Sequence, residues 1–480
     1  MRRRQCRAFL YALAGSCIGV SAFGATPDAA PPPATAPPAT APPAQSNSPT
    51  PKPAPARPTH SSPKRALPDY DRRGKSPTTA GDVALWVPRI LLSPIYLVTE
   101  YGLRVPLGAG ISAAERAHLP EAFYNFFFFG PDHKAGFLPI AFVDFGFRAS
   151  IGLYVFGNDV FFRGNSLNLH GSTSGGDWLA GVLTDRIALG KNSDVSFELS
   201  GVHRPDHTFF GTGSGSLQRN ISRYGETSTV AKVSYDVTPT RILRLQSGVG
   251  LESAHFYGGR FGEDPSIYER VASGAFALPP GFEGYTAVTS QVSAALDTRE
   301  ARPAPGSGVR LEADVRHGSD LRRTPGARWL KYGGTAVGFV DINGYNRVVS
   351  LALHAELADP LGDLPVPFTE QAALGGTAAM RGFFPGRLID RSAAVATLKY
   401  RWPIWVWLDG SLQVATGNVF GERFDDFAFK RFRLSSAIGI ESIGSRDSSF
   451  EMLFGIGSET FEHGTQIDSI RFLIGSNHGF

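Results

Sequence analysis

The chain has 480 residues, with 55 glycines, 35 phenylalanines and only 3 methionines. After residue 25 it lacks the roughly 20 uninterrupted apolar residues that a membrane helix needs, which leaves a soluble protein or a β-barrel. The net charge of +4 comes from residues 1–75, which hold 11 basic and 3 acidic residues. The rest holds 36 basic and 40 acidic residues, so a nucleic-acid-binding face is not predicted.

Residues 1–25 have the pattern of a secretory signal peptide. Four arginines precede a short apolar stretch, and small residues follow as a cleavage site. A short N-terminal membrane helix is the alternative, but the apolar stretch is short and Pro-rich sequence follows. Both cysteines, Cys6 and Cys17, lie here, so the mature chain is expected to have no disulfide or thiolate metal site. Whether Cys17 carries a lipid is left open.

Two segments separate the signal from the repetitive part of the chain. Residues 26–81 are predicted to be a disordered, Pro-rich tether, because 15 prolines fall between positions 26 and 68. Residues 82–136 are more apolar, but Pro88 and Pro94 break any long helix. This second segment is predicted to be an amphipathic lead-in at the membrane interface or a plug inside a barrel, with an irregular lead-in to the first strand as the alternative.

From residue 137 to residue 480 the hydrophobic pattern has a period of two. In 309–316, for example, apolar residues alternate with Arg, Glu, Asp and Arg. We predict about 16 strands, many near the roughly 9–11 residues that cross a bilayer when tilted. They fall near 141–148, 151–156, 166–171, 178–187, 194–201, 226–237, 241–253, 286–297, 308–317, 329–342, 346–357, 393–401, 409–416, 430–440, 448–456 and 468–475.

The connections between the strands and the last strand itself favour a membrane barrel over a soluble sandwich. Some connections between the predicted strands are tight turns, such as Asn343-Gly344, and others are long polar loops, at 202–225 and 254–283. Outer-membrane barrels have this combination of short turns and long loops. The last strand alternates, and the terminal Phe480 continues its apolar parity, which is the usual barrel-end signal. The sequence therefore predicts an all-β, antiparallel transmembrane barrel in the outer membrane of a Gram-negative-type bacterium, because closure satisfies every strand edge in lipid.

One motif resembles a known family. Leu374-Gly375-Gly376-Thr377-Ala378-Ala379-Met380-Arg381-Gly382-Phe383 is similar to the Gly-Gly…Arg-Gly-Phe/Tyr motif of the BamA/TamA superfamily, also called bacterial surface antigens. There the motif lies on a loop after strand 11 that folds into a 16-stranded barrel, and our strand count puts this loop in the same place. Other similar stretches are Leu296-Asp297-Thr298-Arg299 with Pro305 and Gly308, Phe209-Phe210-Gly211-Thr212-Gly213, Tyr400-Arg401-Trp402-Pro403 and the final strand from Arg471.

The resemblance assigns roles to the motif. Gly375 and Gly376 open it, Arg381 enters the lumen, Gly382 lets the backbone turn close to the wall, and Phe383 packs the tip. The alternative is that Arg381 is an ordinary solvated arginine.

A guanidinium inside the lumen needs a fixed acceptor. The family usually supplies an Asp on strand 13 and an acid on strand 12, but here those positions hold Ala415 and Lys399. By strand parity Glu441 and Glu451 face the lumen nearby, so they are the candidate partners.

The resemblance also implies a function, with one departure. Family members that insert or export proteins carry periplasmic substrate-receiving domains, and residues 26–81 are too short and too Pro-rich to supply one. In the family the first and last strands pair weakly and open to perturb the membrane. We therefore expect a role in outer-membrane biogenesis or transport. The alternative is a passive pore or solute channel gated by the 371–391 loop.

The expected partners are outer-membrane lipids and other outer-membrane or periplasmic proteins, without nucleic acid, cofactor or metal. No Gly-x-Ser-x-Gly elbow or phosphate-binding loop is present. His203 and His207 are four residues apart, but Pro205 between them prevents a shared helical face. The sequence thus predicts that the protein is not an enzyme. An outer-membrane hydrolase, the remaining alternative, would need a Ser/His/acid cluster.

Overall fold

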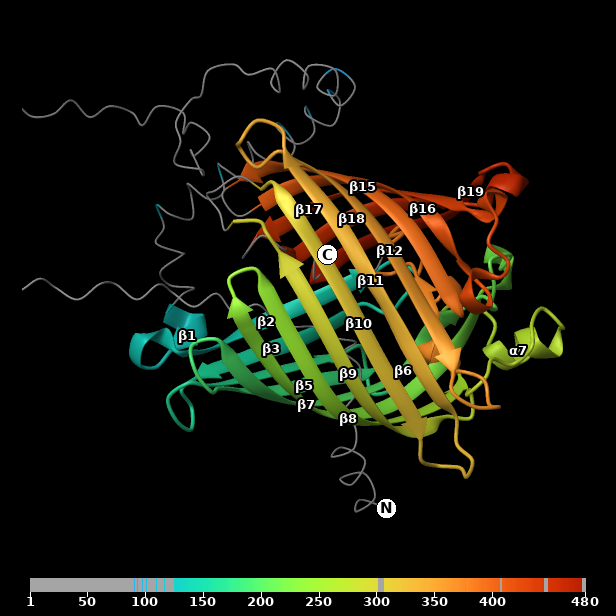
Figure 1. The fold of residues 1–480 in the computed structure, drawn as a ribbon, viewed down its shortest axis with the longest axis horizontal. Coiled ribbons are helices and arrows are strands. Elements are labelled where there is room, and N and C mark those ends of the chain that lie inside the picture. Colours follow the sequence, from blue (N-terminus) through green and yellow to red (C-terminus); the bar gives the residue numbers. More distant parts are fainter. Residues whose placement is uncertain are drawn as a thin grey trace, which may run out of the picture.

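The computed structural model describes residues 125–476, apart from 301–305, 378, 406–407 and 444–447, and a few isolated positions between 90 and 116. Sixteen strands form one closed antiparallel barrel (Figure 1). They are β2 (Ala135–Asp144), β3 (Ser150–Asn158), β4 (Asn165–Thr173), β5 (Leu179–Ala188), β6 (Ser193–Phe209), β7 (Ser222–Thr240), β8 (Leu243–Gly258), β9 (Tyr285–Asp297), β10 (Gly308–Asp320), β11 (Arg328–Asp341), β12 (Val348–Pro360), β15 (Ser392–Trp405), β16 (Leu408–Phe420), β17 (Arg433–Ile443), β18 (Ser448–Ser458) and β19 (Ile467–Ser476).

The remaining elements are short. β1 (Phe128–Phe129) pairs with the start of β2, and β13 (Ala372–Leu374) pairs with β14 (Leu388–Asp390). The helix α7 (Ile267–Ala272) lies at the opposite end of the barrel from β1 (Figure 1), and residues 125–127 before β1 are also helical. The 3-10 turns are η2 (Pro131–His133), η3 (Gln218–Asn220), η4 (Phe368–Glu370), η5 (Glu422–Phe424), η6 (Phe429–Arg431) and η7 (Phe461–His463).

The predicted strand number and antiparallel order are confirmed. On β10, Val309, Leu311 and Val315 are exposed on the outside, and the charged residues between them lie on the inner face. This is the alternation that a barrel with a lipid-facing wall needs. Among the described residues no helix is both long enough and apolar enough to cross a membrane.

The strand boundaries differ from the prediction most at the first strand, which was expected near 141–148 and is Ala135–Asp144, and in one long connection. Half of the segment 202–225, expected as a long outer loop, is strand: residues 202–209 belong to β6 and residues 222–225 to β7, which have 17 and 19 residues. These strands are longer than the roughly 9–11 residues that cross a bilayer. Beyond the lipid the outward side chains need not be apolar, so the period-two signal fades there although the hydrogen-bonded ladder continues. The long connections 259–284, 361–391 and 421–432 all leave the same end of the barrel, the end that faces the outside in such proteins.

The N-terminal predictions lie largely outside the described residues. This holds for the signal peptide at 1–25, for the tether at 26–81 and for most of the segment 82–136. Within the described part of that segment, Phe128 and Phe129 of β1 pair with Gly136 and Ala135. The first barrel strand begins at Ala135, two residues before the predicted start of the barrel at 137 and six before the first predicted strand. The terminal Phe480 also lies outside the described residues.

Candidate functional site: the inward loop and the strand seam

The connection 361–391 between β12 and β15 is the inward loop. It joins the eleventh and twelfth barrel strands, which is where the motif was expected. Its two short strands, β13 and β14, form a hairpin, and between them the chain turns sharply at Gly375 and Gly376, whose φ angles are +101° and +71°. Glycine adopts this left-handed conformation without steric cost. The hairpin places the Arg-Gly-Phe tip of the motif against β17 and β18.

Arg381 contacts one of the two candidate carboxylates. Its Nη1 donates a hydrogen bond to Oε1 of Glu451 on β18, and the two side chains are 8% and 1% exposed. A charge-assisted bond between groups this buried fixes the loop tip to one position on the wall. The next residue adds a second link, since the amide of Gly382 donates to Oγ of Ser435 on β17 at 2.8 Å.

Glycines on β18 make room for the loop tip. The Cα of Gly382 lies 3.0 Å from where a Cβ on Gly455 would be, and the ring of Phe383 lies 2.5 Å from where a Cβ on Gly457 would be. Phe383 itself is completely buried. The sequence pattern alone does not point to this pair of glycines, although their spacing of two on one strand puts them on the same face.

The second candidate carboxylate has a different partner. Glu441 on β17 forms an ion pair with Lys399 on β15, and both are almost completely buried. Lys399 is the residue that replaces the family's usual acid. Ala415, which replaces the other acid, packs in an apolar cluster with the inward loop, including Phe383. The charges are thus rearranged, with carboxylates on β17 and β18 facing cations from β15 and from the loop.

Two further arginines fix the inward loop, and neither was among the residues predicted from the sequence. Arg387 of the loop donates to Oδ2 of Asp468 on β19 at 2.6 Å and to Oγ of Ser216 at 2.8 Å. Arg471 of β19 donates to the carbonyl oxygens of Gly376 and Arg381. The sequence signals for Arg471 were its position on the inner face of the last strand, by parity with Leu473, and its place in the family-like final strand.

The junction between β19 and β2, here called the seam, has the shortest ladder between neighbouring barrel strands in the described part of the chain. Its register pairs Leu473 with Asp144 and Ile474 with Val143, whereas β2 and β3 pair over eight residues. Residues 135 and 136 of β2 pair with β3 along one edge of the strand and with β1 along the opposite edge. β1 therefore lies on the edge of β2 that faces β19. The amide of Phe145 also donates to the carbonyl oxygen of Phe472 at 3.0 Å. Within the described residues, few backbone hydrogen bonds therefore close the barrel at the seam.

Comparison with known proteins decides the family. The model of the Omp85 superfamily domain matches residues 160–459, well over half of the chain. The chain belongs to the Omp85 superfamily. This confirms the resemblance to BamA and TamA and places the protein in the outer membrane of a Gram-negative bacterium. No curated protein sequence matches the chain.

Solved structures of other outer-membrane barrels are similar to the chain. BamA from Haemophilus ducreyi lacking POTRA domains 1–3 is similar with a TM-score of 0.50 and 15% identity, over 72% of this chain and 70% of that one. CdiB from Acinetobacter baumannii has a TM-score of 0.45 and 12% identity, over 72% and 60%. CdiB from Escherichia coli has a TM-score of 0.45 and 12% identity, over 70% and 62%. The likeness to BamA shows a shared barrel fold.

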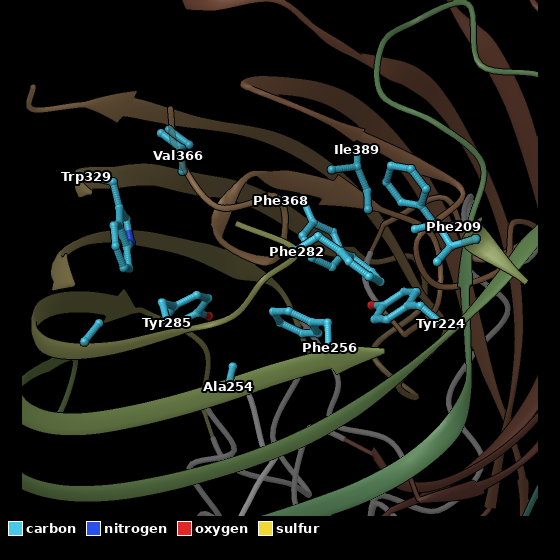
Figure 2. Close-up of a cluster of buried hydrophobic side chains, with 13 residues drawn as sticks. Phe209, Tyr224, Ala254, Phe256, Phe282, Tyr285, Trp329, Val366, Phe368 and Ile389 are labelled. Atoms are coloured by element: carbon cyan, nitrogen blue, oxygen red, sulfur yellow. The ribbon is translucent and has the colours of Figure 1, made fainter. Parts of the chain in front are cut away.

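In this Omp85 barrel the long-loop end is filled by an aromatic cluster (Figure 2). Phe368 of the inward loop lies at its centre, with ring centroids 5.0 Å from Phe256 and 5.3 Å from Tyr224. The buried members come from six barrel strands and the loops: Phe209, Tyr224, Ala254, Phe256, Ile267, Phe282, Tyr285, Ala287, Trp329, Ala358, Val366, Phe368 and Ile389. Burial of this much apolar surface holds the loop inside the barrel.

Polar groups join the aromatic cluster to the wall. Glu370 of the loop accepts hydrogen bonds from Nε1 of Trp329 at 3.1 Å and from the hydroxyl of Tyr285 at 3.2 Å. The same hydroxyl lies 3.0 Å from Oε1 of Glu252, and Arg316 contacts both carboxylates. Tyr285 therefore links two buried acids on different elements.

Replacing Tyr285 with phenylalanine tests the importance of this link. The substitution keeps the ring in the cluster and removes the hydroxyl, so we expect the free energy of unfolding to fall by about 1.5–3 kcal/mol, the usual worth of a hydrogen bond to a charged group. Denaturant unfolding of the refolded barrel measures it. Tyr154→Phe is the matched control, because its hydroxyl donates to the neutral Asn168, and it should cost about 0.5–1.5 kcal/mol. Equal losses would contradict the expectation.

Proposed function

We propose that this Omp85 barrel acts in outer-membrane biogenesis or transport by opening at the seam between β2 and β19. The observation that carries the proposal is the short ladder there: among the described residues, the register pairs Asp144 and Val143 with β19, and the amide of Phe145 donates to the carbonyl oxygen of Phe472. Each backbone group left unsatisfied inside lipid costs several kcal/mol, so a junction with few ladder bonds loses the least when it separates. Counted in backbone hydrogen bonds, the seam is the junction of the described barrel that opens at the lowest cost.

The inward loop disfavours the alternative of a passive channel. It is anchored by Arg381 and Arg387 to two strands of the wall, and its Phe368 lies in the aromatic cluster at the long-loop end. A passive channel needs a permanently open path for its solute. The proposed partners are outer-membrane lipids and outer-membrane or periplasmic proteins that use the opened edge.

A disulfide across the seam tests the proposal. Val143→Cys with Ile474→Cys joins two register partners whose positions face the lipid, so neither change touches the inward loop. In cells that depend on this variant, oxidation should abolish function, measured as loss of outer-membrane protein and lipid content, and reduction should restore it. Function that survives complete cross-linking would overturn the proposal.

A second disulfide serves as the matched control. Leu398→Cys with Val414→Cys joins register partners on β15 and β16, where the ladder is long and both side chains face outward. Oxidation of this pair should leave outer-membrane composition unchanged. The passive-channel alternative is tested by conductance in planar bilayers. A steady pore on deletion of residues 371–391, with normal outer-membrane composition in cells, would favour the channel.

A further inference from the structure

Arg471 is the side chain that bridges the seam. It lies on β19, two residues before Leu473, which is the register partner of Asp144 on β2. Its Nε donates to Oδ1 of Asp144 at 3.1 Å and its Nη2 donates to Oδ2 at 2.7 Å. The two side chains are 1% and 4% exposed. A bidentate ion pair excluded from water is a strong and directional link, and here it spans the junction with the shortest ladder.

The third nitrogen of the same guanidinium, Nη1, contacts the inward loop. Nη1 donates to the carbonyl oxygen of Gly376 and lies 3.4 Å from the carbonyl oxygen of Arg381. Arginine donates in a fixed planar fork, so the positions of Asp144 and of the loop carbonyls must suit one guanidinium at the same time. The seam and the loop tip therefore share a single side chain.

The loop carbonyls are in turn held by contacts away from the seam. Arg381 is fixed by Glu451, and the neighbouring Gly382 is fixed by Ser435. If the tip moves, Nη1 loses its acceptors inside a buried site, and a buried donor without an acceptor is costly. The guanidinium that loses these hydrogen bonds is the one that also holds Asp144, so movement of the loop weakens the ion pair that closes the seam.

We propose that Arg471 is a latch that keeps the β2–β19 seam closed, and that docking of the inward loop sets this latch. The inference rests on the proposed opening at the seam and names the residue that regulates it. Because coupling between two sites is reciprocal, an opened seam also loosens the loop tip. The loop and the seam thus form one two-state element, in which release of either favours release of the other.

Distance measurements across the seam test the latch. Spin labels at Ile151→Cys on β3 and Phe454→Cys on β18 face outward on either side of the seam. They are placed in the full chain, with Cys6 and Cys17 changed to serine, and the chain is reconstituted in lipid vesicles. Pulsed electron paramagnetic resonance gives the distribution of distances.

Arg471→Met and Asp144→Asn should each raise the population with the longer distance by about fivefold or more, the usual size of such coupling. Arg471→Lys keeps the charge without the bidentate fork, so its shift should be intermediate. Arg299→Met is the control, since it removes another arginine with a buried side chain, one that pairs with Asp297 on β9, away from the seam and the inward loop. Distances in both latch variants that match those of the Arg299→Met control would overturn the proposal.

The link to the loop needs its own comparison. Gly382→Val, which displaces the loop tip, should lengthen the seam distance when Arg471 is present and should add little in the Arg471→Met background, which has no guanidinium for the loop to act through. Equal and additive shifts in the two backgrounds would show that the loop does not act through Arg471. These distances report on the latch whether or not cells need the seam to open. If the latch variants shift the distances while the seam disulfide leaves function intact, the proposed function fails and the latch stands.

Discussion

Replacing Arg381 with methionine should lower the free energy of unfolding of the barrel by about 3–5 kcal/mol, the usual cost of removing one partner of a buried ion pair. Glu451 is 1% exposed, so the carboxylate that loses the guanidinium cannot turn to bulk water without moving the strand. Methionine fills much of the same volume as arginine, so lost packing contributes little to the change in free energy. Urea unfolding of the refolded barrel, followed by tryptophan fluorescence and by mobility on unheated gels, measures the change.

Two control variants distinguish the effect of leaving a buried charge unpaired from the effect of losing an arginine side chain. The double variant Arg381→Met with Glu451→Met removes both charges and should recover most of the lost stability, because an apolar pair often replaces a buried ion pair at little cost. Arg323→Met removes an arginine whose pair with Glu283 is more than half exposed, and it should cost no more than about 1 kcal/mol. A single Arg381→Met variant as stable as Arg323→Met would mean that the contact with Glu451 contributes little.

The fold was predictable because the physical rule behind it is local. Each membrane-crossing strand has one face toward lipid, so alternation of single residues reveals it, as in Val309 to Arg316 on β10. The prediction failed at 202–225 for the same reason. Where β6 and β7 extend beyond the bilayer, the lipid no longer selects the outward residues, and the strand loses its signal while it keeps its hydrogen bonds.

The site was predictable only in part, because parity gives the face of a strand and not the opposite partner. Parity placed Glu441 and Glu451 in the lumen, and both are buried there, but only the three-dimensional arrangement shows that Arg381 contacts Glu451 while Glu441 contacts Lys399. Arg471 could not be assigned from sequence, since Asp144 is 327 residues away and lies beside it only after the barrel closes. The glycines at 455 and 457 likewise gain meaning only when the loop tip lies on them.

Replacing Gly382 with valine should prevent the inward loop from docking, and this is the largest steric effect we expect from one substitution in the motif. A Cβ at this position would lie 2.0 Å from the carbonyl oxygen of Ile456 and 2.3 Å from its carbon. Both are backbone atoms of β18, inside a ladder that pairs with β17 and β19, so they cannot move aside as a side chain could. Overpacking a fitted site costs typically about 1–3 kcal/mol and sometimes more, and a branched residue against backbone belongs at the upper end.

Because the conflict lies at the loop tip, the strands remain free to pair and the barrel should still fold, with the tip displaced from the wall. Displacement removes the contact of Arg381 with Glu451 and opens the space that the loop occupies. We therefore expect cleavage by added protease between residues 374 and 388 and a rise in bilayer conductance. Gly338→Val is the matched control, because a Cβ there meets no atom within 4 Å and the position faces outward on β11. A Gly382→Val protein as resistant to protease and as non-conducting as this control would mean that the loop tip is not held by its close contact with β18.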